Sequence, residues 1–457
     1  MKIFKIPIIP YKSTFVGEQN TLDYQAICIF AATGFFLDDD TFFKEQKVLR
    51  PSNTYQIENN TVVSKNTYFK WHYSPVERPL DQIVQEFATL FETIIKEQVG
   101  DKKVILPLSG GLDSRTQAAA LNYLKIPVSS YSYEFTDGHK ETKYSEKIAK
   151  VCNFPFSKWE ISYGYLWNCI EELAKINDCY SEFTHPRQMT FLENYKKMGD
   201  IFSLGHWGDV LFDDMGVSDD LSFNDQVEII IKKIVKKGGI ELAESLWNEW
   251  NLDGSFKDYL KNRIITLLKE IDIPQSANAQ IRAFKSLYWA PRWTTTNLSV
   301  FENAKPITLP YYDNRMCEFI CSVPEHYLSG RQIQIAYLKM RMPELAKITW
   351  QDHRPFNLYN YHWDKKPWNI PYRIFNKVFR ILKNKKIVQR NWELQFLGEE
   401  NDKQLQKWLF ENEKMQTIIP VKLINIFYKN FQNKDAVNYS HPVSILLTLS
   451  LFFKNQK

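Results

Sequence analysis

Cysteine is scarce and scattered in this chain of 457 residues, since none of its six cysteines forms a C-x-x-C pair with another. This spacing predicts neither a zinc site nor a disulfide framework, and we expect reduced cysteines that lie mostly in the core. The first residues lack the long apolar core and small-residue cleavage site of a signal peptide, and no apolar run reaches membrane-spanning length. We therefore expect a cytoplasmic protein. The formal net charge of only +5 does not indicate a nucleic-acid partner.

The order of sequence patterns divides the chain into two expected domains. Residues 1–78 contain short β-like runs and show no long amphipathic helix, which predicts a small β-rich domain. Between Leu80 and Val99, apolar residues recur on one helical stripe, so we place the start of a second domain, residues 79–457, there. Strand-like and helical patterns then alternate, as in an α/β fold with a doubly wound, mostly parallel sheet. Such a sheet binds ligands at the carboxyl ends of its strands.

A glycine-rich loop lies between an apolar strand pattern, Val104–Leu108, and a helical pattern. Its residues are Ser109, Gly110, Gly111, Leu112, Asp113 and Ser114. Paired glycines let the backbone approach a ligand, and the free N–H groups and serine hydroxyls then form a concavity suited to a polyphosphate. A carboxylate beside a polyphosphate is repulsive unless a divalent cation bridges the two, so we interpret Asp113 as a Mg²⁺ ligand. The loop lacks the Lys-Ser/Thr pair of a P-loop, and an ordinary strand-to-helix turn is the alternative.

The string "LPLSGGLDSR", residues 106–115, resembles the pyrophosphate-binding loop of the N-type ATP pyrophosphatases, and most of all the synthetase domain of the asparagine synthetase family. The resemblance implies a sheet of the adenine nucleotide α-hydrolase type, a helical C-terminal half, and the use of ATP with Mg²⁺. It also implies a reaction in which ATP is cleaved between its α and β phosphates, a carboxylate is adenylated, and an amine displaces AMP to form an amide. The loop, residues 109–114, would then bind ATP and the departing pyrophosphate.

A second stretch, "LGHWGDVLF" at residues 204–212, resembles the S-G-E-G-x-D-E-L-F segment of the same family. The resemblance places Gly205 in the ATP site and Asp209 on the family's second metal-binding aspartate. Asp113 and Asp209 would then hold Mg²⁺ from two different strand ends. An aspartate in a surface turn is the alternative.

Two acidic positions of that segment are occupied here by His206 and Val210. The resemblance implies that a pocket for the charged groups of a small amino acid has lost two carboxylates, which makes aspartate doubtful as the substrate. His206 either accepts a proton from an attacking ammonium or is a structural histidine.

A third stretch, "ITWQDHRPFN" at residues 348–357, corresponds to the place where the family keeps a catalytic lysine before a phenylalanine. No lysine is present, so His353 or Arg354 would stabilise the charge on phosphorus and pyrophosphate. We favour Arg354, because a guanidinium is permanently charged and binds phosphate in a bidentate manner. A surface arginine in a loop is the alternative. Glu141 resembles a glutamate of the family's post-adenine helix, or it is only a helix-start acid.

Residues 34–57 resemble the closing strands of the family's glutamine-hydrolysing domain. That domain uses a cysteine directly after the initiator methionine, whereas position 2 here is Lys2, and a thiolate nucleophile is absent there. Cys28 lies in an apolar run and is expected in the core. We therefore interpret residues 1–78 as a reduced glutaminase-like domain without its nucleophile, and we expect no glutamine hydrolysis.

Family members without a working glutaminase include β-lactam synthetases and lasso peptide cyclases, which use an amine on the substrate itself. Many relatives are associated with natural-product or surface-glycan biosynthesis. We place this chain nearest them, as a ligase that joins a small-molecule or peptide carboxylate other than aspartate to an amine. A nucleotide-binding protein without turnover and a pyrophosphatase-type enzyme that modifies RNA are the alternatives. The first is expected to lose Asp113 or Asp209, and the second usually has a cysteine pair, which is missing.

The segment of residues 365–390 has nine basic and no acidic side chains. The apolar residues of its expected helix are Ile374, Phe375, Val378, Phe379, Ile381 and Leu382. Such a segment can make a weak contact with an anionic surface or hold an acidic substrate, and we favour the plainer interpretation as a solvated helix face. The apolar stretch of residues 441–453 is too short to span a bilayer and predicts a buried last helix.

Overall fold

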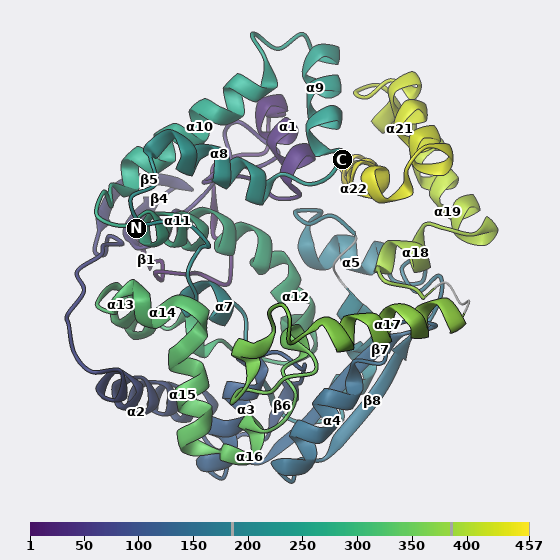
Figure 1. The fold of residues 1–457 in the computed structure, drawn as a ribbon. Coiled ribbons are helices and arrows are strands. Elements are labelled where there is room, and N and C mark those ends of the chain that lie inside the picture. The colour runs from purple at the N-terminus through teal and green to yellow at the C-terminus, as the bar shows by residue number, and fades with distance from the viewer. Residues whose placement is uncertain (184–186, 384–386, 457) are drawn as a thin grey trace.

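A five-stranded parallel sheet lies at the centre of the computed structural model, which describes residues 1–183, 187–383 and 387–456 (Figure 1). Its strands are β6 (Val104–Pro107), β7 (Val128–Phe135), β8 (Phe156–Ile161), β9 (Ile201–Ser203) and β10 (Ile307–Thr308). They lie in the order β10-β9-β6-β7-β8, and every neighbouring pair runs parallel. The predicted doubly wound α/β sheet is therefore confirmed.

The strand order reverses at β6, in the middle of the sheet. The chain passes from β6 to β7 and β8 on one side, and then returns to β9 directly beside β6 on the other side. In register, Val104 of β6 lies opposite Val128 of β7 and Ile201 of β9. Because ligands bind where the order of parallel strands reverses, the loops after β6 and β9 meet at one crevice.

The first three residues of β6 are fully buried, which fits the central place of this strand in the sheet. Val104, Ile105 and Leu106 have no exposed surface, as expected for a parallel strand covered on both faces. The predicted stripe of the first long helix is also buried, with Phe87 and Ile94 fully enclosed. The helices of this part of the chain are α2 (Leu80–Val99), α3 (Asp113–Tyr123), α4 (Thr142–Val151), α5 (Ile170–Asn177), α6 (Leu192–Tyr195) and α7 (Gly208–Leu211).

The N-terminal residues form small antiparallel sheets, as predicted, and one helix that the sequence patterns did not predict. The strands are β1 (Lys2–Lys5), β4 (Asn53–Glu58) and β5 (Thr61–Thr67) in one sheet, and β2 (Phe15–Val16) with β3 (Lys47–Val48) in another. Helix α1 (Tyr24–Thr33) is apolar on all sides, and residues 26–33 are buried, so it has no polar face that would give a helical period. It packs closely on α9 (Gly239–Glu249), because a Cβ on Gly239 would lie 2.3 Å from the carbonyl oxygen of Ala32.

The C-terminal half is helical, as the resemblance implied. Its helices are α8 (Phe223–Ile234), α10 (Phe256–Ile271), α11 (Ala277–Phe284), α12 (Thr295–Ala304), α13 (Asn314–Cys321), α14 (Glu325–Leu328), α15 (Gln332–Arg341), α16 (Pro343–Ala346), α17 (Ile370–Lys383), α18 (Asn391–Gln395), α19 (Glu399–Phe410), α20 (Glu413–Gln416), α21 (Val421–Asn433) and α22 (Ala436–Asn455). Among the described helices, α22 alone is long and apolar enough to cross a membrane. However, 83% of its most apolar window is buried, and Phe452 stacks on Phe42 at 3.7 Å between ring centroids. Its burial fits the predicted last core helix.

One continuous helical rod, residues 277–304, joins α11 to α12 through the π-helical segment η2 (Lys285–Thr294). Pro291 lies inside η2 and removes one backbone donor from the rod. π-Helical insertions are frequent at functional sites, because the wider turn changes which side chains share a face.

Arg282 fixes this rod to α14 through a buried ion pair and to the segment after β9 through backbone carbonyls. Arg282 of α11 donates to both carboxylate oxygens of Glu325, at 2.6 and 2.7 Å. The same guanidinium donates to the backbone carbonyls of Val210 and Asp213, at 3.2 and 2.9 Å. The side chains of Arg282 and Glu325 are both almost completely buried. Arg282 therefore holds together the rod, α14 and the segment that carries Asp209.

We expect Arg282→Ala to lower the free energy of unfolding by about 3–5 kcal/mol, because it leaves the Glu325 carboxylate buried without its partner. Urea denaturation of the two proteins measures the difference. The double variant Arg282→Ala/Glu325→Ala should regain part of the loss, since it removes the unpaired charge. A loss below about 1 kcal/mol in the single variant would contradict the assignment.

Candidate active site

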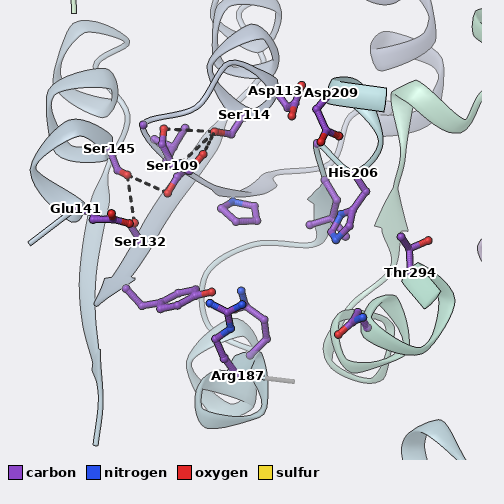
Figure 2. A pocket seen from close by; sticks show the side chains of 18 of the residues that line it. Ser109, Asp113, Ser114, Ser132, Glu141, Ser145, Arg187, His206, Asp209 and Thr294 are labelled. Atoms are coloured by element: carbon purple, nitrogen blue, oxygen red, sulfur yellow. Dashed lines mark hydrogen bonds between the residues drawn. The ribbon is translucent and has the colours of Figure 1, made fainter. Parts of the chain in front are cut away.

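A cavity of about 790 Å³ lies at the crevice where the loops after β6 and β9 meet. One side is formed by the loop after β6, with Ser109, Gly110, Asp113 and Ser114, as Figure 2 shows for three of these side chains. The opposite side is formed by the η2–α12 part of the rod and by Arg187. The cavity therefore brings together two regions that the sequence analysis identified and one that it did not.

The loop after β6 is shaped by its own hydrogen bonds. The backbone N–H of Ser109 donates to Ser114 Oγ at 3.0 Å, and the N–H of Gly111 lies 3.3 Å from Ser109 Oγ. The N–H of Gly110 donates to Oε1 of Gln351 at 3.1 Å. Backbone donors of this loop thus already face oxygen acceptors, which is the role that a phosphate oxygen would take.

Not every residue of the predicted phosphate loop reaches the cavity. Ser109, Gly110, Asp113 and Ser114 line it, whereas Gly111 and Leu112 do not. Leu112 is fully buried and anchors the loop to the core.

Arg115 connects this loop to the segment of residues 345–351. Its buried guanidinium donates to the carbonyl of Gly110 at 3.0 Å and to the carbonyls of Ile348 and Thr349, each at 3.0 Å. Burial lowers the pKa of Arg115 to about 10, which still leaves it a cation at neutral pH. The third predicted stretch is therefore positioned beside the phosphate loop, as the resemblance implied, and Gln351 is its residue that lines the cavity.

His353 and Arg354 do not line the cavity. His353 Nδ1 lies 3.1 Å from Asp364 Oδ2, and its ring packs on that of Trp350 at 4.1 Å between centroids. Both residues follow Gln351 in the same short loop. Their proposed role as catalytic cations stays a prediction.

Asp113 and Asp209 lie together at the rim of the cavity, above His206 in the view of Figure 2. Loss of water contact raises the pKa of the Asp113 carboxyl to about 6; the charge of Arg331 opposes this rise and that of Asp209 adds to it. Arg331 forms an ion pair with Asp113, and Gln334 Nε2 donates to the same carboxylate oxygen at 3.2 Å. Asp113 is thus held between two donors while another carboxylate faces it.

Glycines make this close approach of the two loops possible. A Cβ on Gly205 would lie 3.0 Å from Cβ of Asp113, and a Cβ on Gly208 would lie 2.3 Å from Asp113 Oδ1. Trp207, between them, has a left-handed backbone with φ of 74°, at a position where the family segment has glycine. The backbone of the loop after β9 therefore packs directly against Asp113.

The carboxylates of Asp113 and Asp209 fit a Mg²⁺ ion that is also bound to phosphates. They are hard oxygen donors. Burial, with the like charge of Asp209 added, raises the pKa of Asp113, and a divalent cation would relieve the repulsion between the two carboxylates. Among the described residues, no cluster of three or more possible metal ligands is present. Two protein carboxylates with phosphate and water oxygens are the usual ligands of Mg²⁺ at nucleotide sites.

His206 lines the cavity, and burial lowers its pKa to about 4, with the charge of Asp209 opposing the shift. Its Nδ1 atom is buried and has no hydrogen-bond partner within the described part of the chain. The imidazole is therefore neutral at physiological pH. A group of this pKa is a weak acceptor for a proton from an ammonium, which argues against the proposed role as base.

The rod adds a group of residues that the sequence analysis missed. Lys285, Trp289, Trp293 and Asn297 follow one another at intervals of four, and all line the cavity. Nζ of Lys285 lies 5.7 Å from the ring centroid of Trp207 and 5.3 Å from that of Trp289. Burial lowers the pKa of Lys285 to about 8, with the charge of Asp209 opposing the shift. The i, i+4 spacing of these residues in "KSLYWAPRWTTTN" is the sequence pattern that could have identified them.

Glu141 and Arg187 extend the site, and the position of Cys28 argues against a second, glutamine-hydrolysing site. Glu141 and Arg187 line the cavity, and Figure 2 shows them at its left and at its bottom. Cys28 is fully buried in α1, and burial raises its pKa well above the ordinary value of a thiol. Cys28 therefore does not replace the missing nucleophile of a glutaminase.

The asparagine synthase family model matches residues 86–367 of the chain. The matched residues include both loops, the whole parallel sheet and the rod that forms the opposite wall. A search of curated proteins found no match. The resemblance first seen in two short motifs thus extends over more than half of the 457 residues.

Acid should destabilise the protein in part through His206, whose pKa of about 4 lies below its unfolded value of about 6.5. As pH falls from about 6.5 to 4, the unfolded chain binds the proton first, so stability is lost in that window and not above it. We expect His206→Gln to reduce the loss between pH 7.5 and pH 5 by up to about 2 kcal/mol. Urea denaturation at the two pH values measures this, and equal losses in both proteins would contradict it.

Proposed function

This chain belongs to the asparagine synthase family, which implies an ATP-dependent ligase function, and we propose that it is an AMP-forming amide synthetase. Its substrates in this proposal are ATP with Mg²⁺, a carboxylate other than aspartate on a small molecule or peptide, and an amine. The observation that carries the proposal is the cavity itself. It joins the phosphate loop and two carboxylates to a wall with a recessed cation and two tryptophans.

The phosphate side of the cavity suits departure of pyrophosphate. When a carboxylate oxygen attacks the α-phosphorus of ATP, the bond to the β-phosphate oxygen breaks and pyrophosphate leaves with additional negative charge. Backbone N–H groups such as that of Gly110, together with the hydroxyls of Ser109 and Ser114, would stabilise that charge. A Mg²⁺ ion held by Asp113 and Asp209 would neutralise phosphate charge when bound.

The opposite side of the cavity suits an acyl substrate. Lys285 places a positive charge next to Trp207 and Trp289, where a carboxylate would be attracted and water excluded. Exclusion of water protects an acyl adenylate from hydrolysis until an amine attacks its carbonyl carbon and AMP leaves. The amine loses a proton in that step. The phosphate of the departing AMP is an acceptor for it, whereas His206 is a poor one because its pKa is about 4.

The replacements in the loop after β9 support a substrate other than aspartate. His206 is neutral, and Val210 is buried and apolar, where the family segment has two carboxylates. Neither side chain supplies the negative charge that would attract the ammonium group of a free amino acid. The proposal is that the amine is supplied as such, not from glutamine. Natural-product and surface-glycan biosynthesis are the contexts that fit such a ligase.

We expect Asp113→Asn to lower ATP-dependent pyrophosphate release at least about a hundredfold, because a neutral amide is a poor ligand for Mg²⁺. The assay supplies ATP, Mg²⁺ and a panel of carboxylates with and without added amine, and measures pyrophosphate and AMP. Asp220→Asn, on an exposed part of the segment after β9, is the matched control. Unchanged turnover in Asp113→Asn would contradict the metal assignment. No release from any carboxylate, together with an ATP-induced rise in melting temperature, would favour a nucleotide-binding protein without turnover.

Lys285→Met and Arg354→Met compare the cation in the cavity with the cation expected from sequence. If Lys285 stabilises charge in the transition state, Lys285→Met should lower kcat by roughly 10²–10³ while changing the KM for ATP little. Lys285→Arg should recover part of that loss, since the charge returns. A large defect only in Arg354→Met would instead support the prediction from sequence.

A further inference from the structure

Helix α17 and the turn before it expose an unusual concentration of large apolar side chains. Trp368, Ile374 and Phe375 are 62%, 58% and 66% exposed. The set, here named the α17 face, consists of Trp363, Trp368, Ile370, Ile374, Phe375 and Val378. Single exposed apolar residues are ordinary on protein surfaces, but a contiguous group indicates an interaction surface. The side chains of this face are exposed, so both expectations for the segment, a solvated helix face and a contact with an anionic surface, stay predictions.

Positive charge surrounds this face. Lys365, Lys366, Arg373 and Lys377 are exposed, and the segment of residues 365–390 has no acidic side chain. On the helix, Ile370, Ile374 and Val378 follow one another at intervals of four, and Arg373 and Lys377 lie along the edge of that row. The side chains of Phe379, Ile381 and Leu382 lie outside the described residues.

We propose that the α17 face docks on the surface of an anionic lipid bilayer. A basic amphipathic helix lies in the plane of the interface, with its apolar side at the acyl boundary and its basic side chains at the headgroups. Tryptophan favours that depth, and the rings of Trp363 and Trp368 stack at 6.0 Å between centroids beside the helix. The complementary charge of the lipid distinguishes this occupant from an uncharged apolar partner.

The length of α17 fits a helix that lies on the surface of a bilayer and not one that spans it. Its 14 residues extend about 21 Å, whereas the hydrocarbon core of a bilayer is about 30 Å thick. Figure 1 shows α17 running from the middle of the fold to its right-hand side. Val388 and Gln389, shortly after the helix, line the cavity. Docking of the α17 face would therefore bring the active-site opening close to the membrane, whatever substrate the enzyme uses.

The test is co-sedimentation of the full chain with vesicles of phosphatidylcholine alone or with phosphatidylglycerol added. We expect binding only to the anionic vesicles, and weaker binding as salt rises, because headgroup attraction is screened. Absence of binding to anionic vesicles at low salt would overturn the proposal. Equal binding to both kinds of vesicle would overturn the electrostatic part of it.

Matched variants on two helices locate the surface. Ile374→Ser should weaken binding roughly tenfold, and Arg373→Glu/Lys377→Glu roughly ten- to a hundredfold. The same changes on α21, Ile426→Ser and Lys422→Glu/Lys429→Glu, involve residues that are also exposed and should leave binding unchanged.

Sedimentation equilibrium without lipid separates a bilayer from a second copy of the chain. We expect the wild type and Ile374→Ser to have the same mass. A wild-type dimer that Ile374→Ser dissociates would show that a second copy covers the α17 face, and would overturn the proposal. Equal loss of vesicle binding in the α17 and α21 variants would overturn it as well.

Discussion

Two carboxylates that follow neighbouring strands, Asp113 at the start of α3 and Asp209 in α7, impose the main constraint on this structure. Burial of the Asp113 carboxyl and the like charge of Asp209 raise the pKa of Asp113. Arg331 and Gln334 compensate on one side, and a divalent cation with phosphates would compensate on the other. Gly205 and Gly208 allow the two loops to approach this closely, because a Cβ at either position would crowd Asp113.

Buried guanidinium groups hold the surrounding segments in place. Arg115 attaches the phosphate loop to residues 345–351, and Arg282 attaches the rod to the loop after β9. Each donates to several backbone carbonyls, so each fixes the path of the chain and not only one side chain. The phosphate side of the cavity is thereby rigid, as a site that stabilises transient charge requires.

The rod supplies the variable side of the site. Its π-helical segment directs Lys285 and two tryptophans toward the same cavity as the phosphate loop. Large aromatic walls and a neutral His206 create a pocket different from one built of carboxylates for a small amino acid. Within one family, the loops that bind ATP can thus stay similar while the opposite wall changes the acyl substrate.

The sequence by itself determined the strands and helices around the two loops, and the pairing of Asp113 with Asp209. Apolar strands ending in glycine-rich turns are local patterns, and parallel strands place their carboxyl ends at one edge. The sequence did not reveal α1, because a helix buried on all sides has no polar period. It pointed to Arg354, whereas only the tertiary structure showed that Gln351 of that stretch reaches the cavity. The positions of Lys285 and Arg187 in the cavity, and of Arg282 in its buried ion pair, were likewise shown only by the tertiary structure. Their roles depend on which distant backbone and side chains surround them, and no local pattern encodes that environment.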